Sequence, residues 1–183
     1  MTKPQTFAAL ALGAALSASL LVCAAARADT ATVTINAITA EGIGAEIGTA
    51  TVTDGKDGAA IAIEIKGLSA GEHGMHVHEK GDCAAGEKDG KKVAGLAAGP
   101  HFDPGKAGKH EGPAGAGHMG DLPKLMIEGA STKAALVAPK VKVADIAGRA
   151  LIIHEGGDTY SDTPDALGGG KGRIACGVIQ AAK

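Results

Sequence analysis

The sequence predicts an all-β domain of eight short antiparallel strands, folded as a barrel or sandwich, with two long functional loops. Three features of the 183-residue chain indicate this class. Apolar and polar residues alternate with a period of two in several short segments, as in strands with one buried face. Twenty-nine glycines without a Gly-X-Y period indicate many turns and loops. No segment has the longer apolar periodicity of a long amphipathic helix.

The strands can be placed in order along the chain. The alternation is clearest at Val33-Thr34-Ile35 and Ile61-Ala62-Ile63, and turns are marked by Asp54-Gly55 and Glu128-Gly129. About eight such strands are typical of sandwiches and barrels. We expect strands at 31–37, 45–53, 61–66, 73–79, 124–128, 133–138, 140–143, 149–155 and 173–180.

Residues 1–28 have the pattern of a cleavable signal peptide. A lysine precedes an apolar run over 7–26, and Ala26-Arg27-Ala28 matches an A-x-A cleavage site. A membrane-spanning helix is the alternative, but the run is rich in alanine and ends at the cleavage pattern. A lipid-bearing Cys23 is disfavoured because a bulky valine precedes it. We expect export to the periplasm, residues 29–183 as one mature domain, and no membrane association after cleavage.

The composition argues against a nucleic-acid partner. The net charge is −2, and it becomes −4 when the leader removes two basic residues and no acidic one. Proteins that bind a phosphate backbone usually carry a basic surplus. The chain has only three aromatic residues, Phe7, Phe102 and Tyr160, which is too few for base stacking.

Two cysteines, Cys83 and Cys176, remain outside the leader. In an exported chain two cysteines predict one disulfide. They lie 93 positions apart, so the bond would stabilise the fold by about 4–5 kcal/mol in a loop-entropy model. Two unpaired buried thiols are the alternative, and they would suit a cytosolic protein better.

None of the seven histidines lies in the leader. His76 and His78 are two positions apart on an expected strand, so both point to its outer face, while Met75 and Val77 point into the core. His154, on a late strand, can join them. Surroundings made only of imidazoles suit copper as well as zinc.

A second set of metal-ligand types lies in the first of two long connections, which span about 80–123 and 156–172. Loops of this length in a compact domain are usually functional. His101, His110, His118 and Asp121 provide the three imidazoles and one carboxylate that a closed tetrahedral zinc site takes. The loop is rich in glycine and proline, so a bound ion would supply the order that apolar packing cannot. A solvated loop with incidental histidines accounts for His110 alone, but not for the whole set.

At this point four ordered segments resemble the copper/zinc superoxide dismutase family. The resemblance covers almost all of residues 31–180 and implies an eight-stranded Greek-key β-barrel. The bacterial secreted branch is the most similar, because Lys88-Asp89-Gly90-Lys91 and Gly168-Gly169-Gly170 also match it. The four segments are Gly74-Met75-His76-Val77-His78-Glu79, Gly99-Pro100-His101-Phe102-Asp103-Pro104, His118-Met119-Gly120-Asp121-Leu122 and Gly172-Arg173-Ile174-Ala175-Cys176-Gly177-Val178.

Carried over by matching residues, the resemblance implies two metal sites that share one ligand. Copper would be bound by His76, His78, His101 and His154. Zinc would be bound by His101, His110, His118 and Asp121, with the His101 ring deprotonated as a bridge. The resemblance further implies an arginine at the mouth of the copper site (Arg173), a disulfide (Cys83–Cys176), a structural histidine (His73) and a carboxylate that orients one copper and one zinc histidine (Asp158).

The activity implied by the resemblance is the conversion of two superoxide anions and two protons to oxygen and hydrogen peroxide, with copper cycling between Cu²⁺ and Cu⁺. Arg173 would hold the anion, and His101 would open on the copper side and take up a proton. Lys88, Lys91 and Lys92 would guide the anion, with a merely solvated surface as the alternative. The mature protein would be a homodimer or a monomer.

Two other functions fit parts of this pattern. One is a periplasmic metal-binding or copper-delivery protein on the same scaffold, and the other is a structural zinc module without turnover. The presence of all four copper histidines together with Arg173 favours the enzyme over both.

Overall fold

The computed structural model describes Met1 and residues 29–182, so the predicted signal peptide, apart from Met1, lies outside the described residues. The regular secondary structure of the described chain is almost entirely β, with three very short helices. Its elements are β1 (Thr30–Thr39), β2 (Gly42–Gly55), β3 (Gly58–Lys66), β4 (Gly71–His73), β5 (Met75–His78), β6 (Gly86–Lys88), β7 (Lys91–Val93), η1 (Leu96–Ala98), β8 (Leu125–Ile127), β9 (Ser131–Ala138), α1 (Val143–Ile146), β10 (Ala150–His154), η2 (Ala166–Gly169) and β11 (Arg173–Ala181).

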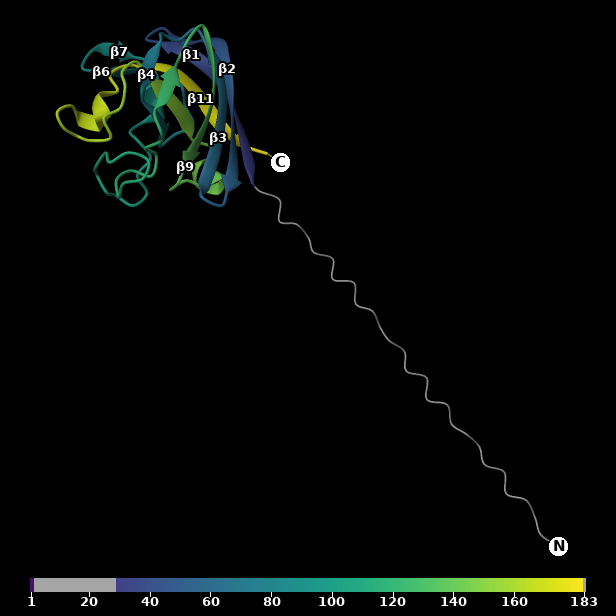
Figure 1. The fold of residues 1–183 in the computed structure, drawn as a ribbon. Coiled ribbons are helices and arrows are strands. Elements are labelled where there is room, and N and C mark those ends of the chain that lie inside the picture. Colours follow the sequence, from purple (N-terminus) through teal and green to yellow (C-terminus); the bar gives the residue numbers. More distant parts are fainter. Residues whose placement is uncertain (2–28, 183) are drawn as a thin grey trace.

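Seven of these strands form one curled antiparallel sheet in the order β5-β10-β11-β1-β2-β3-β9 (Figure 1). The connections from β3 to β5 and from β9 to β10 cross between distant positions of this sheet, as in a Greek key. β4 pairs with β8 and is separated from β5 only by Gly74, so β4 and β5 are one interrupted strand. Counted in this way, and with the short β6–β7 hairpin set aside, eight of the nine expected ranges are strands, and the predicted all-β Greek-key architecture is confirmed.

The core is built from the inward-facing half of each alternating segment. In β3, for example, Ile61, Ile63 and Ile65 are buried and the residues between them are exposed. Met75 and Val77 belong to this core, as predicted, and Phe102 is its one aromatic member. Small and branched aliphatic side chains therefore supply most of the apolar area whose burial drives folding.

The predicted strand at 140–143 is wrong. Val141 and Val143 are both buried, so the alternation correctly marks an inward-facing pair. The backbone, however, leaves the sheet: the amide of Val141 closes a turn onto Ala138, and the amide of Val143 donates to the Asp54 carboxylate at 2.8 Å and begins α1. The alternation thus reports burial here without sheet pairing.

The two long connections contain structure of their own. β6 and β7 form a hairpin across Asp89 and Gly90, both with positive φ, a two-residue turn of the kind that favours hairpins. Figure 1 shows both connections gathered at one side of the molecule, away from β2 and β3. They cover the outer face of β5 and β10. No helix in the described range has the length and apolar character needed to cross a membrane.

Candidate metal centre

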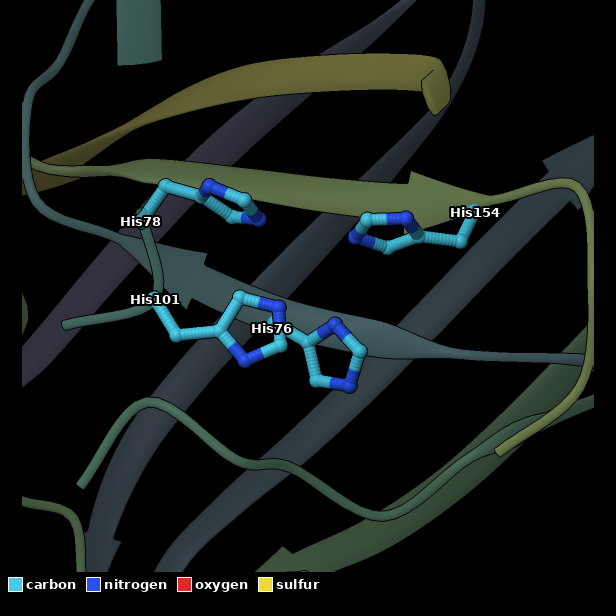
Figure 2. A group of neighbouring side chains, drawn as sticks. All are labelled: His76, His78, His101 and His154. Atoms are coloured by element: carbon cyan, nitrogen blue, oxygen red, sulfur yellow. The ribbon is translucent and has the colours of Figure 1, made fainter. Parts of the chain in front are cut away.

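Four imidazole rings converge on the covered outer face of the sheet (Figure 2). His76 and His78 come from β5, His154 ends β10, and His101 lies in the first long connection. One ring nitrogen of each lies within 4.8 Å of one ring nitrogen of every other. The rings of His76 and His101 are closest, with centroids 4.0 Å apart. The four predicted copper ligands are therefore brought together.

Sheet pairing fixes three of these rings. β5 and β10 are antiparallel neighbours in which His76 is opposite Ile152, and the amide of His154 donates to the carbonyl of Gly74. Side chains with alternate positions share a face, so His76, His78 and His154 lie on the face opposite the core. The two long connections cover this face and bury the rings, since the exposed fraction is 6% or less for all three.

The loop that carries His101 is attached to the free edge of β5 by backbone hydrogen bonds. The amide of Phe102 donates to the carbonyl of Val77 at 2.8 Å, and the amide of Val77 donates to the carbonyl of Gly120 at 2.9 Å. A β-carbon at position 120 would overlap the carbonyl of Val77. Only glycine permits this approach, which places His101 and Asp121 beside His78 and His76 respectively.

In the four rings of the expected copper group, the existing hydrogen bonds leave ring nitrogens free to bind a metal. His78 Nδ1 lies 2.8 Å from the carbonyl of Gly99 and so donates its proton there. His78 Nε2, His76 Nδ1 and His154 Nε2 are buried and have no hydrogen-bond partner in the described part of the chain. Buried polar atoms without partners are costly. A copper ion bound by these nitrogens and by His101 would satisfy them, so the residues present fit the implied group.

The second predicted set also comes together. Asp121 Oδ1 lies 3.2 Å from His101 Nδ1, 3.0 Å from His110 Nδ1 and 3.2 Å from His118 Nδ1. Ligands around one tetrahedral zinc, with bonds of about 2.0–2.1 Å, are separated by roughly 3.3 Å. The observed spacing is close to that value, and all four side chains are buried. The residues therefore fit zinc, and His101 belongs to both groups.

Asp158 connects the expected copper group and the expected zinc group by contacting one histidine of each. Its Oδ2 lies 2.7 Å from His76 Nε2, and its Oδ1 lies 2.7 Å from His110 Nε2. A β-carbon on Gly168, which has a φ of 72°, would collide with Asp158 and His110. Glycine at this position therefore lets the second connection cover the pair. Orientation of one histidine from each group by a single carboxylate is the arrangement expected for Asp158.

Burial keeps the four histidines of the expected copper group (His76, His78, His101 and His154) neutral. It lowers the pKa of His101 to about 4 and that of His154 to about 2, and it also lowers the pKa values of His76 and His78. These rings are therefore neutral at pH 7, as metal binding requires.

His110 differs from the other rings. Burial lowers its pKa, but hydrogen bonds with Asp121 and Asp158 outweigh that effect and raise it to about 9. Burial would raise the pKa values of the two carboxyls, yet their histidine partners hold both well below the usual range. Without metal, an imidazolium at His110 therefore lies between two carboxylates.

His73 lies beside the first group and has its ring between two backbone carbonyls. Nδ1 is 2.7 Å from the carbonyl of His154, and Nε2 is 3.0 Å from the carbonyl of Ser69. The ring is buried. It joins the end of β10 to the segment before β4.

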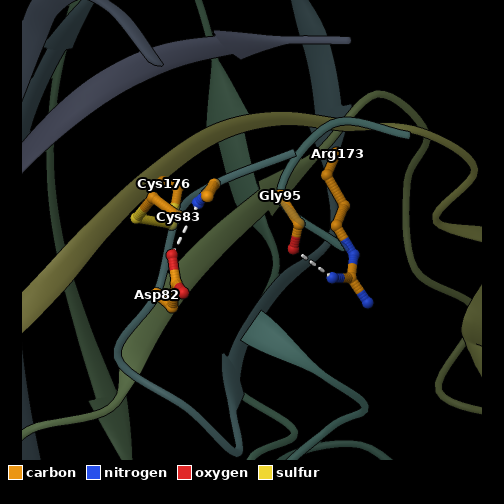
Figure 3. The surroundings of a disulfide bond; sticks show 6 residues. Asp82, Cys83, Gly95, Arg173 and Cys176 are labelled. Carbon is orange, nitrogen blue, oxygen red and sulfur yellow. Dashed lines mark hydrogen bonds between the residues drawn. A yellow bond between two sulfur atoms is a disulfide. The ribbon is translucent and has the colours of Figure 1, made fainter. Parts of the chain in front are cut away.

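Arg173 is held against the first connection beside the disulfide (Figure 3). Its Nη1 donates to the carbonyl of Gly95 at 2.5 Å, and its Nη2 donates to the carbonyl of Gly99 at 2.7 Å. The carbonyl of Gly99 also accepts the proton of His78. The guanidinium is therefore fixed next to the first group of histidines, where the prediction places it.

Cys83 and Cys176 form the predicted disulfide, with Cα atoms 5.7 Å apart. The bond ties the first connection to β11, three residues from Arg173 (Figure 3). Its sulfurs belong to a small apolar cluster on the outer face that includes Ala98 and Ile152. The disulfide thus anchors the segment whose carbonyls hold the arginine.

Replacing either cysteine with serine is expected to lower the free energy of unfolding by about 4–5 kcal/mol, because the unfolded chain loses a 93-residue loop constraint. Urea unfolding of Cys83→Ser, Cys176→Ser and the double variant measures the loss. Each single variant should lose as much as the double, since either removes the bond. A loss below about 1 kcal/mol would contradict the loop-entropy model.

The three predicted steering lysines lie on the β6–β7 hairpin. Lys88 is opposite Lys91, and all three side chains are exposed. None of them forms an ion pair with another described residue. Gly86 of the same hairpin lies against Leu96 of η1, and the residues on either side of η1, Gly95 and Gly99, accept the hydrogen bonds of Arg173. The hairpin is thus adjacent to the segment that holds the arginine.

The sequence reasoning missed Asp162. Its Oδ2 accepts the amide of His110 at 2.8 Å, and its Oδ1 accepts the amide of Leu167 at 3.0 Å. The side chain therefore joins the second connection to the loop of the second group. An aspartate two residues before a proline is a turn signal, but nothing in the sequence indicates which distant amide it binds.

Comparison with known proteins agrees with the geometry. Residues 46–179 match the family model described as copper/zinc superoxide dismutase. A relative from Escherichia coli (strain K12), named a Cu-Zn superoxide dismutase, is 47% identical over 165 residues, which is 88% of this chain and 95% of the relative.

Two solved structures are similar to this fold. The Cu/Zn superoxide dismutase from Brucella abortus has a TM-score of 0.81 and 46% identity, over 82% of this chain and 99% of that one. The monomeric copper, zinc superoxide dismutase from Salmonella enterica has a TM-score of 0.74 and 44% identity, over 82% of this chain and 99% of that one. With both ligand groups assembled as the motifs predict, the chain belongs to the copper/zinc superoxide dismutase family.

Proposed function

We propose that this protein converts two superoxide anions and two protons to oxygen and hydrogen peroxide. Copper would be held by His76, His78, His101 and His154, and zinc by His101, His110, His118 and Asp121. The observation that carries the proposal is the position of His101, whose ring belongs to both groups of converging ligand atoms. A copper ion bound there supplies the one-electron exchange that oxidises one superoxide and reduces the next.

The chain's own residues bind the anion and supply a proton. The Arg173 guanidinium, fixed by two carbonyls, presents its positive charge beside the first group and attracts the superoxide anion. His101 has Nδ1 directed at Asp121, which leaves Nε2 for the copper side. With Nδ1 held by Asp121, Nε2 of His101 would hold a proton and pass it to the anion that is being reduced.

Metal analysis combined with a superoxide-dismutation assay tests the proposal. One copper and one zinc per chain with high activity supports it. Full copper and zinc without turnover supports the copper-delivery alternative. Zinc alone, even after copper has been supplied, supports a structural zinc module. The complete set of four imidazoles and Arg173 at one place favours the enzyme.

Zinc binding to the metal-free protein is expected to release about one proton from His110 near pH 7.5. The pKa of His110 is raised to about 9, so its ring is charged at this pH and must lose the proton on Nδ1, while Nε2–H stays with Asp158. The release should disappear as the pH rises past 9. Isothermal titration calorimetry in buffers of different ionisation enthalpy counts the protons.

The control for this measurement is Asp158→Asn, which removes one of the carboxylates that raise the pKa of His110. This variant should release fewer protons at pH 7.5 than the unaltered protein. A release that is the same at pH 7.5 and pH 10 would show that His110 is already neutral in the metal-free protein.

We further propose that Lys88, Lys91 and Lys92 attract the anion to the site. Lys91→Gln/Lys92→Gln should lower the dismutation rate at low ionic strength and flatten its dependence on salt. At 0.1 M salt the attraction between exposed charges is largely screened beyond about 10 Å, so steering acts mainly at lower salt. Lys56→Gln/Lys66→Gln is the matched control, with the same net charge and exposed positions in the β2–β3 turn and at the end of β3. Equal salt dependence of the two double variants would exclude steering by the hairpin.

The proposal includes export to the periplasm, with residues 1–28 as the signal peptide. Ala26-Arg27-Ala28 and the disulfide support it, since disulfides persist in oxidising compartments. Protein recovered from a periplasmic extract should begin at Asp29. The mature chain would act as a monomer, as the Salmonella enterica relative is described, or as a homodimer, and sedimentation equilibrium separates the two.

A further inference from the structure

Lys140 lies in the turn between β9 and α1, on the barrel rather than in either long connection. The turn is fixed by the bond from the Val141 amide to the carbonyl of Ala138, and both residues are buried. From this position Lys140 Nζ donates to the carbonyl of His118 at 2.8 Å and to the carbonyl of Gly112 at 3.0 Å. The ammonium therefore spans the two arms of the loop that carries His110 and His118.

This loop has little apolar packing to order it. Most of residues 103–117 are exposed or half-buried, with His110 and Gly112 as buried exceptions. The amide of His118 closes the neck of the loop onto the carbonyl of Lys109 at 3.0 Å, and Asp162 of the second connection holds the amide of His110. Among the hydrogen bonds of the described residues, only those of Lys140 attach this loop to the barrel.

The Lys140 ammonium is committed to these carbonyls rather than to an ion pair. No carboxylate oxygen of the described residues lies within 4.0 Å of its Nζ, although Asp121, Glu111 and Asp103 are close enough to act on its charge. Its side chain is half-buried. A charged donor held between two carbonyls makes stronger hydrogen bonds than a neutral one, so the contact can hold the loop against its conformational entropy.

We propose that Lys140 is a positioning residue for the zinc half of the centre. By holding the carbonyls of Gly112 and His118, it keeps Nδ1 of His110 and of His118 directed at Asp121 before an ion arrives. This inference rests on the proposed function only in taking these three side chains as zinc ligands. Residues that orient metal ligands from outside commonly change metal affinity by about 10–100-fold.

Three variants separate positioning from a general effect on folding. Lys140→Met keeps the length of the side chain and removes the donors, whereas Lys140→Arg keeps charge and donors. Lys142→Met is the matched control, because Lys142 is exposed, lies two residues away and makes no side-chain capping bond. Zinc release from the loaded protein into a chromogenic chelator gives the rate, and the visible spectrum of Co²⁺ in the zinc position reports the ligand geometry.

Lys140→Met should release zinc about 10-fold faster and alter the Co²⁺ spectrum. Lys140→Arg should keep a release rate and a spectrum close to those of the unaltered protein, and Lys142→Met should match the unaltered protein in both. Unchanged zinc release and spectrum in Lys140→Met would overturn the inference, as would equal effects in Lys142→Met. Hydrogen exchange of the metal-free protein gives a readout that needs no ion: amides at 109–118 should exchange faster in Lys140→Met. If the unaltered protein bound no zinc, the proposed function would fail. The exchange of amides 109–118 in Lys140→Met would still show whether Lys140 orders the loop that carries His110 and His118.

Discussion

Replacing His101 with alanine is expected to lower the dismutation rate by at least about 100-fold, because one substitution removes a ligand from both groups. The same ring supplies the nitrogen that carries a proton in the proposed reaction. Copper and zinc content should both fall in the purified variant. Electron paramagnetic resonance of copper-loaded protein, with His101 intact and replaced, shows whether the copper environment has lost this ring.

His110→Ala is the matched comparison, since it removes a buried imidazole from the second group and leaves the four rings of the first group in place. Its copper resonance should keep the features of four nitrogen ligands, and its activity should fall less. If the copper resonance were unchanged in His101→Ala and altered in His110→Ala, the assignment of the two groups would be wrong.

The fold could be predicted from the sequence where a single face of a strand is buried. Ile61, Ile63 and Ile65 alternate because β3 has one buried face, and the strand predicted at 61–66 is confirmed. At Val141 and Val143 the same alternation accompanies a turn and a short helix. The Asp54 carboxylate of β2 accepts the hydrogen bond of the Val143 amide, which in a sheet would pair with a neighbouring strand. Alternation of apolar and polar residues therefore indicates which side chains are buried, but it does not by itself show that the backbone pairs in a sheet.

The ligand groups could be predicted because their residue types and spacing carry the chemistry. The residues that hold the loops in place have no such signature, since they bind backbone carbonyls and ring faces. Arg149 shows this: its guanidinium lies 3.5 Å from the ring centroid of Phe102, next to His101, and it also donates to the carbonyl of Glu79. Any residue has a carbonyl, so the sequence does not indicate which one Arg149 or Lys140 reaches.

The metal-free protein is expected to be most stable near pH 6.5–7 and to lose stability on both sides. Burial lowers the pKa of His101 to about 4 and that of His154 to about 2, below the unfolded value of about 6.5. Their contribution is present above pH 6.5 and is lost as the pH falls toward 4, because the unfolded chain binds protons that the folded chain does not. Between about pH 4.5 and 6, these two histidines alone make the free energy of unfolding fall by about 3 kcal/mol for each pH unit that the pH is lowered.

On the alkaline side His110 acts in the opposite direction. Its pKa is raised to about 9 in the folded protein, so its contribution is complete below about pH 6.5 and is lost as the pH rises through 9. Urea unfolding of metal-free protein from pH 4.5 to 9.5 gives the profile. His154→Leu, which replaces a buried neutral ring by an apolar side chain, should reduce the acid slope by about one proton and leave the alkaline limb unchanged. An acid slope that is the same in His154→Leu would mean that His154 is already protonated in the folded protein, and the convergence of neutral rings on one copper would lose its physical basis.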